Sequence, residues 1–457
     1  MTDGTGGREI ERGAREVGPG SGRSEAVSTL SPLERRVVDT LDVPAMLELL
    51  GRLVAIESLA GRERPAQELV ARRMEELAME PDVWAIDFAE LRRHPAYAAD
   101  VERQEGLGVV GGLGGEGDDG ERRGNDGRTL ILNGHVDVVP AGEPDRWSRP
   151  PFELTVEGDR VYGRGTADMK GGLCAALAAG QAIRDAGVEL EGVLQIQSVI
   201  GEEDGGMGTL ATLLRGHTGD GAVVLEPTDL VLAPAQAGAF NFRITIPGRA
   251  AHGALRSEGV DPIEKLLPLY ARILELEAER NHGVDEPMFS DYDLPFAICV
   301  GKVRAGVWAS TVAESLTLEG RYGVSPDEDP DVARAQLERA VREVADADPW
   351  LRDHPPELQW WGARFEPAHT PADDPVVGAV DGAFGAVTGR RPEIRGMTYG
   401  ADMRLLVREA GIPTVLFGPG DVRDAHRPDE SVAVADLETV ARTMAVTALR
   451  FCGVAGE

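Results

Sequence analysis

The strongest constraint on the fold is a series of short apolar segments, each of which ends in polar residues that include an acid or a histidine. Three such segments, with their polar ends, span residues 130–135, 193–203 and 221–226. Helical stretches such as residues 173–185 separate these strands, and this alternation is typical of an α/β fold with a mostly parallel sheet. Because sites in such sheets lie beyond the carboxyl ends of the strands, we expect the polar residues to meet at one edge.

His135 and Asp137 follow the first of these strands and are two residues apart. In an extended chain, side chains at positions i and i+2 point to the same face, so these two can lie side by side. A carboxylate beside a histidine can fix the tautomer of a metal-binding imidazole and raise its basicity. Taken alone, the pattern is equally typical of a polar turn at a strand end.

Glu202 and Glu203 place two adjacent carboxylates at the end of the second strand. One can bind a metal ion while the other handles the proton of an attacking water; the simpler alternative is a solvated acidic turn. Asp168 lies in a glycine-rich loop before a helix, where it could instead cap the helix N-terminus. The loop lacks the Gly-Lys-Ser/Thr order of a P-loop, which disfavours phosphate binding there.

Glu226 and His426 add two further potential ligands, although each could be an ordinary loop residue when considered alone. Together with His135, Asp168 and Glu203 they form a set that contains only carboxylates and imidazoles. Such a set fits two metal ions bound by oxygen and nitrogen. Zn²⁺ suits these ligands, and Co²⁺ or Mn²⁺ could replace it. The sequence therefore predicts a centre with two divalent metal ions.

Length and charge limit the class of protein. A chain of 457 residues is long for one core, so we expect two domains. The formal net charge of −31 argues against a nucleic acid or an anionic membrane as partner. We expect a cytoplasmic protein that acts on a small molecule, since the sequence has neither a signal peptide nor an apolar stretch of spanning length. Cys174, Cys299 and Cys452 are far apart and are expected to be small core residues.

The order of elements predicts a second domain inserted into the first. Residues 237–364 follow the order strand, helix, strand, strand, helix, strand of a ferredoxin-like α+β module. The α/β pattern then returns, so we expect the catalytic domain to comprise residues 31–236 and 365–457. Residues 1–30 are expected to form a disordered tail, and the glycine-rich residues 101–128 a surface loop between two strands.

These motifs, in this order, resemble those of the co-catalytic zinc metallopeptidase and deacylase family. Members of that family include acetylornithine deacetylase, succinyl-diaminopimelate desuccinylase, aminoacylase and carboxypeptidase G. The resemblance covers roughly residues 40 to 450 and is closest to the acetylornithine-deacetylase-like branch. The motifs that carry it are Gly134-His135-Val136-Asp137, Gly165-Thr166-Ala167-Asp168-Met169-Lys170-Gly171-Gly172, Gly201-Glu202-Glu203, Glu226-Pro227-Thr228, His252 and His426.

The resemblance implies how the metal ligands divide. His135 and Glu226 would bind one ion, and Glu203 and His426 the other. Asp168 would bridge both ions. Two ions about 3.5–4 Å apart polarise a scissile carbonyl and make a hydroxide available near neutral pH. The resemblance also implies the fold, a mostly parallel metallohydrolase domain with an inserted dimerisation or lid domain.

Three further roles follow from the same resemblance. Asp137 would orient His135. Glu202 would be the general base for attack by a metal-bound hydroxide and would then protonate the leaving nitrogen. His252 would donate a hydrogen bond to the oxyanion, and in several family members this histidine comes from the partner subunit. The resemblance thus implies a homodimer formed through the inserted domain.

One departure affects the substrate-binding contacts. Where many family members have an Asn-Val-Ile-Pro turn in the inserted domain, this chain has Trp308-Ala309-Ser310-Thr311-Val312. Arg321 and Arg404 are the candidates for binding a substrate carboxylate through two parallel hydrogen bonds. A structural or surface role is an equally good interpretation of either arginine.

The predicted function is a metal-dependent amidohydrolase that cleaves an N-acyl amino acid or a related small N-acyl amine, as deacetylases, desuccinylases and deformylases do. The first alternative is an exopeptidase that acts on dipeptides or on C-terminal residues with the same metal ions and base. Glu rather than Asp at position 226 favours deacylases and carboxypeptidases over aminopeptidases, on the resemblance alone. The second alternative is a metal-binding relative that has lost catalysis, which the presence of Glu202 disfavours.

Overall fold

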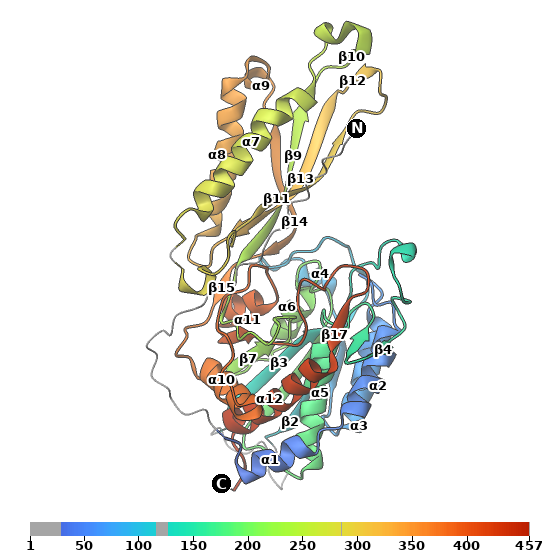
Figure 1. Ribbon diagram of the computed structural model, residues 1–457, viewed down its shortest axis with the longest axis vertical. Coiled ribbons are helices and arrows are strands. Elements are labelled where there is room, and N and C mark those ends of the chain that lie inside the picture. Colours follow the sequence, from blue (N-terminus) through green and yellow to red (C-terminus); the bar gives the residue numbers. More distant parts are fainter. Residues whose placement is uncertain (1–28, 116–126, 285, 457) are drawn as a thin grey trace, which may run out of the picture.

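The computed structural model describes residues 29–115, 127–284 and 286–456. Most of the predicted disordered tail (residues 1–28) and part of the predicted surface loop (residues 116–126) lie outside the described residues. Figure 1 shows two parts, a larger one built on a six-stranded sheet and a smaller one built on a four-stranded sheet.

The six-stranded sheet is mostly parallel, as predicted. In spatial order its strands are β1 (Asp82–Ala85), β2 (Leu107–Gly114), β6 (Val193–Val199), β3 (Thr129–His135), β7 (Gly221–Val224) and β16 (Thr414–Leu416). Neighbours from β6 to β16 run parallel, whereas β2 is antiparallel to both β1 and β6. The central strands are buried on both faces, because helices cover both sides.

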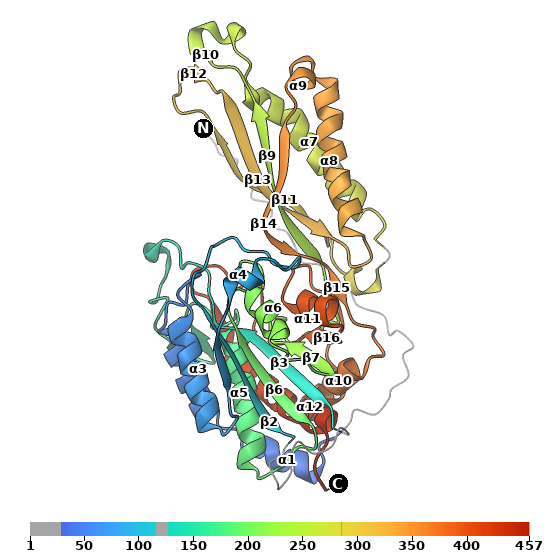
Figure 2. The same cartoon turned by 180° about the vertical axis from the view of Figure 1, so that it is seen from behind.

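Helices lie on both faces of this sheet. Figure 1 shows α5 and α12 in front of the sheet, and the reverse view in Figure 2 shows α6 and α11 on the other face. The helices of this part are α1 (Pro32–Asp39), α2 (Val43–Val54), α3 (Arg64–Glu76), α4 (Phe88–Leu91), α5 (Lys170–Asp185), α6 (Met207–Leu214), α10 (Pro375–Thr388), α11 (Met403–Ala410) and α12 (Val434–Cys452). The helix α1 begins at a capping box, in which the Ser31 side chain accepts from the amide of Glu34 and the Glu34 carboxylate accepts from the amide of Ser31.

The prediction of a surface loop over residues 101–128 is wrong for Leu107–Gly114, which form β2 inside the sheet. The glycines in this strand allow close packing. A Cβ at Gly108 would lie 2.1 Å from the Trp84 ring, and one at Gly111 would lie 2.9 Å from the Met74 sulfur. We predicted a loop from these glycines, but in the structure they let neighbouring side chains pack closely on the strand.

The smaller part has the predicted ferredoxin-like topology. Its elements are β9 (Gly238–Pro247), α7 (Pro262–Asn281), β11 (Ile298–Ala305), β13 (Ser315–Val324), α8 (Pro330–Ala347), α9 (Pro349–Asp353) and β14 (Glu357–Phe365). The sheet order is β11-β13-β9-β14 and all pairs are antiparallel. The strand β9 alternates buried and partly exposed residues, and its buried face packs with α7 and α8 in a separate apolar core.

Short strands complete the structure. The pair β10 (Ala251–His252) and β12 (Thr311–Val312) lies at the far end of the smaller part (Figure 1). The pair β8 (Ala235–Gln236) and β15 (Ala368–His369) lies where the chain leaves and re-enters the larger part. A third sheet contains β4 (Thr155–Glu157), β5 (Arg160–Tyr162) and β17 (Ser431–Ala433). The four-stranded sheet lies between β8 and β15 in sequence, and the domain bounds given above remain a prediction.

Two further observations concern the sequence expectations. Cys174 and Cys452 are buried as expected, but Cys299 is exposed, so its predicted place in the core is wrong. Cys299 belongs to β11, an edge strand on which most side chains point away from the core. None of the helices in the described part of the chain is long and apolar enough to cross a membrane.

Candidate metal centre

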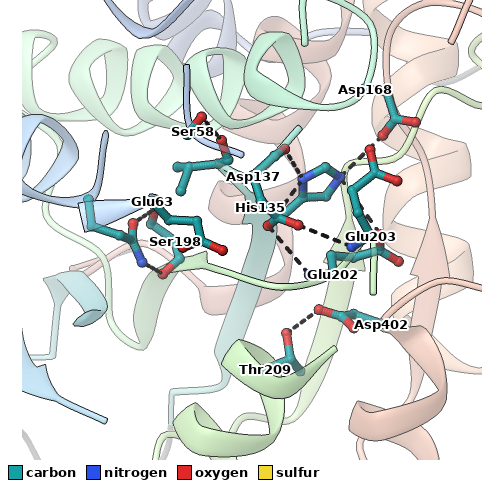
Figure 3. A network of polar contacts seen from close by, with 12 residues as sticks. Ser58, Glu63, His135, Asp137, Asp168, Ser198, Glu202, Glu203, Thr209 and Asp402 are labelled. Carbon is teal, nitrogen blue, oxygen red and sulfur yellow. Dashed lines mark hydrogen bonds and ion pairs between the residues drawn. The ribbon is translucent and has the colours of Figure 1, made fainter. Parts of the chain in front are cut away.

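The predicted ligands come together at the carboxyl ends of β3, β6 and β7, as expected for a parallel sheet. His135 is the last residue of β3, and Glu203 and Glu226 come shortly after β6 and β7. Asp168 precedes α5, and His426 lies between β16 and β17. Figure 3 shows the side chains of His135, Asp168 and Glu203 directed toward one another.

The two oxygens of Asp168 face different histidines. Oδ1 lies 3.2 Å from Nε2 of His135, and Oδ2 lies 3.3 Å from Nε2 of His426. Nε2 of His426 is also 2.9 Å from a carboxylate oxygen of Glu203. Asp168 therefore stands between the two imidazoles, a position from which one carboxylate can bind two ions.

Two groups of potential ligand atoms converge within 4.8 Å of one another. The first comprises His135, Asp168 and Glu203, and the second comprises His135, Glu202 and Glu226. These residues are buried except Glu203, which is partly exposed. The His426 side chain is 52% exposed, so it lies on the side from which solvent and a small molecule can enter.

His135 is oriented by Asp137, but mainly through the backbone. Its Nδ1 lies 2.9 Å from the Asp137 carbonyl oxygen and 3.6 Å from the nearer Asp137 carboxylate oxygen. A carbonyl can only accept, so Nδ1 carries the proton and donates it in this hydrogen bond. The lone pair of Nε2 then points toward Asp168, which is the tautomer that a metal ion requires.

The Asp137 carboxylate instead holds the turn that follows β6. It accepts hydrogen bonds from the backbone amides of Glu202, at 3.4 Å, and Glu203, at 3.1 Å. Figure 3 shows these contacts. Asp137 thus sets the position of His135 through its carbonyl and of the two adjacent glutamates through its carboxylate.

Glu430, which was not predicted as a site residue, fixes the loop that carries Asp168. One of its carboxylate oxygens accepts from the amides of Gly165, Ala167 and Asp168 at 3.0, 3.0 and 3.1 Å. The other lies 2.5 Å from the Arg164 guanidinium. The helix-cap alternative for Asp168 finds no support, since the N-terminus of α5 has Met169 at the cap position and no side-chain cap.

The electrostatics of the cluster are those of a site built for cations. Burial, followed by the neighbouring Glu226 charge, raises the pKa of Glu202 well above its usual range. Burial likewise raises the pKa of Glu226, with Asp168 the next cause. Burial alone lowers the pKa of His426, but hydrogen bonds to Asp168 and Glu203 raise it to about 11. Without a metal ion, the protonated His426 imidazole therefore offsets part of the negative charge of these carboxylates.

One buried carboxylate oxygen of the cluster has no partner in the described part of the chain, and this bears on whether the residues fit metal ions. Oε1 of Glu226 is buried and has no hydrogen-bond partner among the described residues. A buried carboxylate oxygen without a partner is costly, and binding a cation is one way of satisfying it. The donor set of carboxylates and imidazoles also matches Zn²⁺, Co²⁺ or Mn²⁺. The residues present fit divalent ions.

Asp402 is a further acid beside the centre that the sequence did not single out. It is fully buried, and one of its oxygens accepts from the Thr209 hydroxyl at 2.6 Å (Figure 3). Asn133 donates to the same hydroxyl oxygen at 3.0 Å. Burial raises the pKa of Asp402 to about 6. Its only signal in the sequence was its place two residues before Arg404.

The contacts of Arg404 favour the structural alternative, and its role in binding a substrate carboxylate stays a prediction. The side chain is buried, and its guanidinium lies 3.1 Å from the Glu366 carboxylate and donates to the Gly205 carbonyl at 2.7 Å. These contacts occupy two of its guanidinium nitrogens in the interior. Arg404 ties the end of the inserted segment to the glycine turn after Asp204.

Arg321 lies where the two parts meet. It comes from β13 of the smaller part and donates to the Thr398 carbonyl of the larger part at 2.7 Å. It forms no ion pair with the described residues, so a role in binding a substrate carboxylate remains a prediction. The hydroxyl of Tyr399, the residue after Thr398, donates to the carbonyl of Pro227 at 3.4 Å. Pro227 directly follows Glu226.

His252 is not part of the cluster within one chain. It lies in β10, at the end of the smaller part that is distant from the six-stranded sheet (Figure 1). The side chain is exposed, and its Nδ1 accepts from the amide of Ala254 at 3.2 Å, so it caps a short 3-10 helix. The helix-capping alternative is thus observed at Nδ1, while Nε2 is left for another partner.

Comparison with known proteins places these observations in a family. The chain is 32% identical over 343 residues to an N-formyl-4-amino-5-aminomethyl-2-methylpyrimidine deformylase of Halalkalibacterium halodurans. The matched region covers 71% of this chain and 79% of the relative. It is 27% identical over 334 residues to a probable succinyl-diaminopimelate desuccinylase of Staphylococcus aureus, covering 66% of this chain and 78% of the relative.

A solved structure shares the fold. A family M20 metallo-carboxypeptidase from Sulfolobus solfataricus superimposes with a TM-score of 0.70 at 17% identity, over 88% of this chain and 98% of the other. The model of peptidase family M20/M25/M40 matches residues 131–450, which contain every predicted metal ligand. The predicted family, and with it a metal-dependent amidohydrolase, is confirmed: the chain belongs to peptidase family M20/M25/M40.

Proposed function

We propose that this protein hydrolyses the amide bond of a small N-acyl amine, and that an N-formyl group on an aminomethyl-substituted heteroaromatic ring is the first substrate to test. The observation that carries the proposal is the convergence of His135, Asp168, Glu202, Glu203 and Glu226 at one sheet edge. The choice of acyl group and amine is supported by the relative of 32% identity that is named as a deformylase of this kind.

Two divalent ions, with Zn²⁺ as the first candidate, complete the proposal. His135 and Glu226 would hold one ion and Glu203 and His426 the other, with Asp168 between them. The two faces of Asp168, each directed at a different histidine, support this division. When bound, such ions polarise the scissile carbonyl and acidify a water near neutral pH.

Glu202 is the proposed general base. Its nearer carboxylate oxygen lies 4.0 Å from Nε2 of His135, so it faces the cluster. The Glu202 carboxylate accepts a proton from the attacking water and then returns it to the leaving nitrogen, so that the amine departs neutral. Asp137 holds the amide of Glu202 and so keeps the carboxylate in reach of both atoms.

A substrate panel tests the function. We expect the metal-loaded protein to release formate from an N-formyl aminomethylpyrimidine faster than it cleaves N-acetyl and N-succinyl amino acids or dipeptides. The measurement is kcat/KM for each compound under one set of conditions. Preference for N-succinyl amino acids would move the assignment to the desuccinylase named among the relatives. Preference for dipeptides would make the protein an exopeptidase, and no turnover of any compound would contradict the proposed function.

We further propose a homodimer formed through the inserted part. Four large apolar side chains on α7 are exposed, and their spacing of four, three and four residues places them on one face of the helix. They are Ile263, Leu267, Tyr270 and Leu274, at 50%, 68%, 44% and 43% exposure. The helix packs against β11, the edge strand of the sheet. A second copy could cover this stripe in a symmetric contact. A cytoplasmic location remains a prediction.

In such a dimer, His252 would reach the partner's metal centre and donate from Nε2 to the developing oxyanion. Loss of one such donor typically costs about a hundredfold to a thousandfold in kcat. We therefore expect His252→Ala to be dimeric, metal-replete and slow, and His354→Ala, which removes another exposed histidine of the same part, to keep normal turnover.

Subunit exchange shows whether His252 acts across the interface. A mixture of His252→Ala with Glu202→Gln should recover activity, because one of the two sites in each hybrid then has both groups. Exchange is verified with differently tagged subunits. A mixture that is as inactive as both parents after verified exchange would show that His252 does not act in the partner's site.

A further inference from the structure

Arg103 is a buried cation next to the turn that carries two of the proposed site residues. Its side chain is fully buried. Nε lies 2.7 Å from the Glu63 carboxylate, and a terminal guanidinium nitrogen lies 2.8 Å from the Asp204 carboxylate. Arg103 belongs to the segment just before β2, which the sequence alone assigns to a surface loop.

The partners of Arg103 place it behind the turn that carries Glu202 and Glu203. Asp204 directly follows these glutamates. The carboxylate of Asp204 also accepts from the amide of Val101 at 3.0 Å, so the whole segment before β2 is tied to the turn. At the other end of the turn, a Cβ on Gly201 would lie 3.3 Å from the central guanidinium carbon. The guanidinium thus binds the turn at Asp204 and lies near Gly201 at its other end.

The turn is held at two places. The Asp137 carboxylate accepts from the backbone amides of Glu202 and Glu203. Arg103 holds Asp204, the next residue, and Glu63, which precedes α3, fixes Arg103 in turn. A planar guanidinium can serve two carboxylates in fixed geometry, which a flexible lysine ammonium does less well.

From this arrangement we propose that Arg103 is a positioning residue that fixes the Glu202–Glu203 turn through Asp204, and so sets the place of the proposed base and of one metal ligand. This inference rests on the proposed function for its kinetic consequence. Arg103 touches neither group directly and contributes no reacting atom. Its effect therefore differs from that of Glu202: turnover falls because the base and ligand are displaced, while substrate binding by the rest of the site is retained.

Two variants test the inference in the full-length protein. Asp204→Asn keeps the shape of the side chain and leaves the Arg103–Glu63 pair intact, while weakening the contact with the turn. Arg103→Lys keeps the charge but loses the planar group that can bind two carboxylates at once. We expect each to lower kcat about tenfold to hundredfold, the usual effect of outer-shell partners, with KM changed less than about threefold. The visible absorption of the Co²⁺-loaded protein should also change, because Glu203 is proposed as a ligand.

Arg280→Met is the matched control. The Arg280 side chain is only 5% exposed and pairs with Glu328 at 2.7 Å, but it lies in the inserted part. The Arg280→Met protein should lose thermal stability while keeping the wild-type kcat and Co²⁺ spectrum. Folded, metal-loaded Asp204→Asn and Arg103→Lys proteins with unchanged kcat and an unchanged Co²⁺ spectrum would overturn the inference. The spectrum needs no substrate, so it still tests Arg103 if the wild-type protein turns over no compound of the panel and the proposed function fails.

Discussion

Removal of divalent metal by a chelator should abolish hydrolysis, and Zn²⁺ or Co²⁺ should restore it. The residues of the centre cannot polarise a carbonyl in this way alone, because the carboxylates repel a developing negative charge. Their raised pKa values and the unpaired oxygen of Glu226 show how unfavourable the cluster is without cations. The measurements are activity and metal content after dialysis, together with the melting temperature, which should rise when the ions are returned because they bind the folded state.

A ligand substitution separates this effect from non-specific inhibition by the chelator. Glu226→Gln keeps the size of the side chain but removes its charge, so bound metal should fall from about two ions to about one per chain. Glu34→Gln is the control, since Glu34 is a buried carboxylate paired with Arg450, outside the centre. It should keep both ions. Activity that survives complete removal of metal would contradict the proposed mechanism.

Glu202→Gln should lose at least about a hundredfold in kcat while it still binds metal. Loss of a general base typically costs about a hundredfold to ten-thousandfold, and here the same group also protonates the leaving nitrogen. The amide keeps the shape of the side chain and leaves the backbone hydrogen bond to Asp137 in place. Steady-state kinetics and metal analysis on the same sample provide the test, with Glu34→Gln again as control.

The two readouts have to be taken together. Slow turnover in a protein that has lost metal would assign Glu202 to metal binding. The Glu202 carboxylate converges with His135 and Glu226, so it is placed to bind an ion. Near-normal turnover in a metal-replete protein would show that Glu202 is only an acidic turn residue. Only slow turnover with both ions retained supports the role of base.

The sequence predicted best the segments with a clear apolar pattern and the polar residues at their ends. Alternation predicts a strand over Val193–Val199, and the helical pattern predicts a helix over residues 173–185. The structure places β6 at the first and α5, which begins three residues earlier, over the second. The ligands could be found because each lies at a strand or loop end whose position follows from the sheet topology. Some short elements escaped: β1 has four residues, and α6 and α11 have eight each, too few for a periodic pattern to stand out.

What the sequence by itself determined is therefore the family, the mostly parallel sheet, the inserted module and the identity of the clustered acids and histidines. The tertiary structure alone decided which polar residues support them. Glu430, Asp402 and Arg103 come from distant segments to lie beside the centre or behind the loops that carry its ligands, and Arg404 is turned into the interior toward Glu366. Partners of buried charges are chosen by distance in space, which no local pattern encodes, because a charge removed from water must find its partner wherever the folded chain provides one.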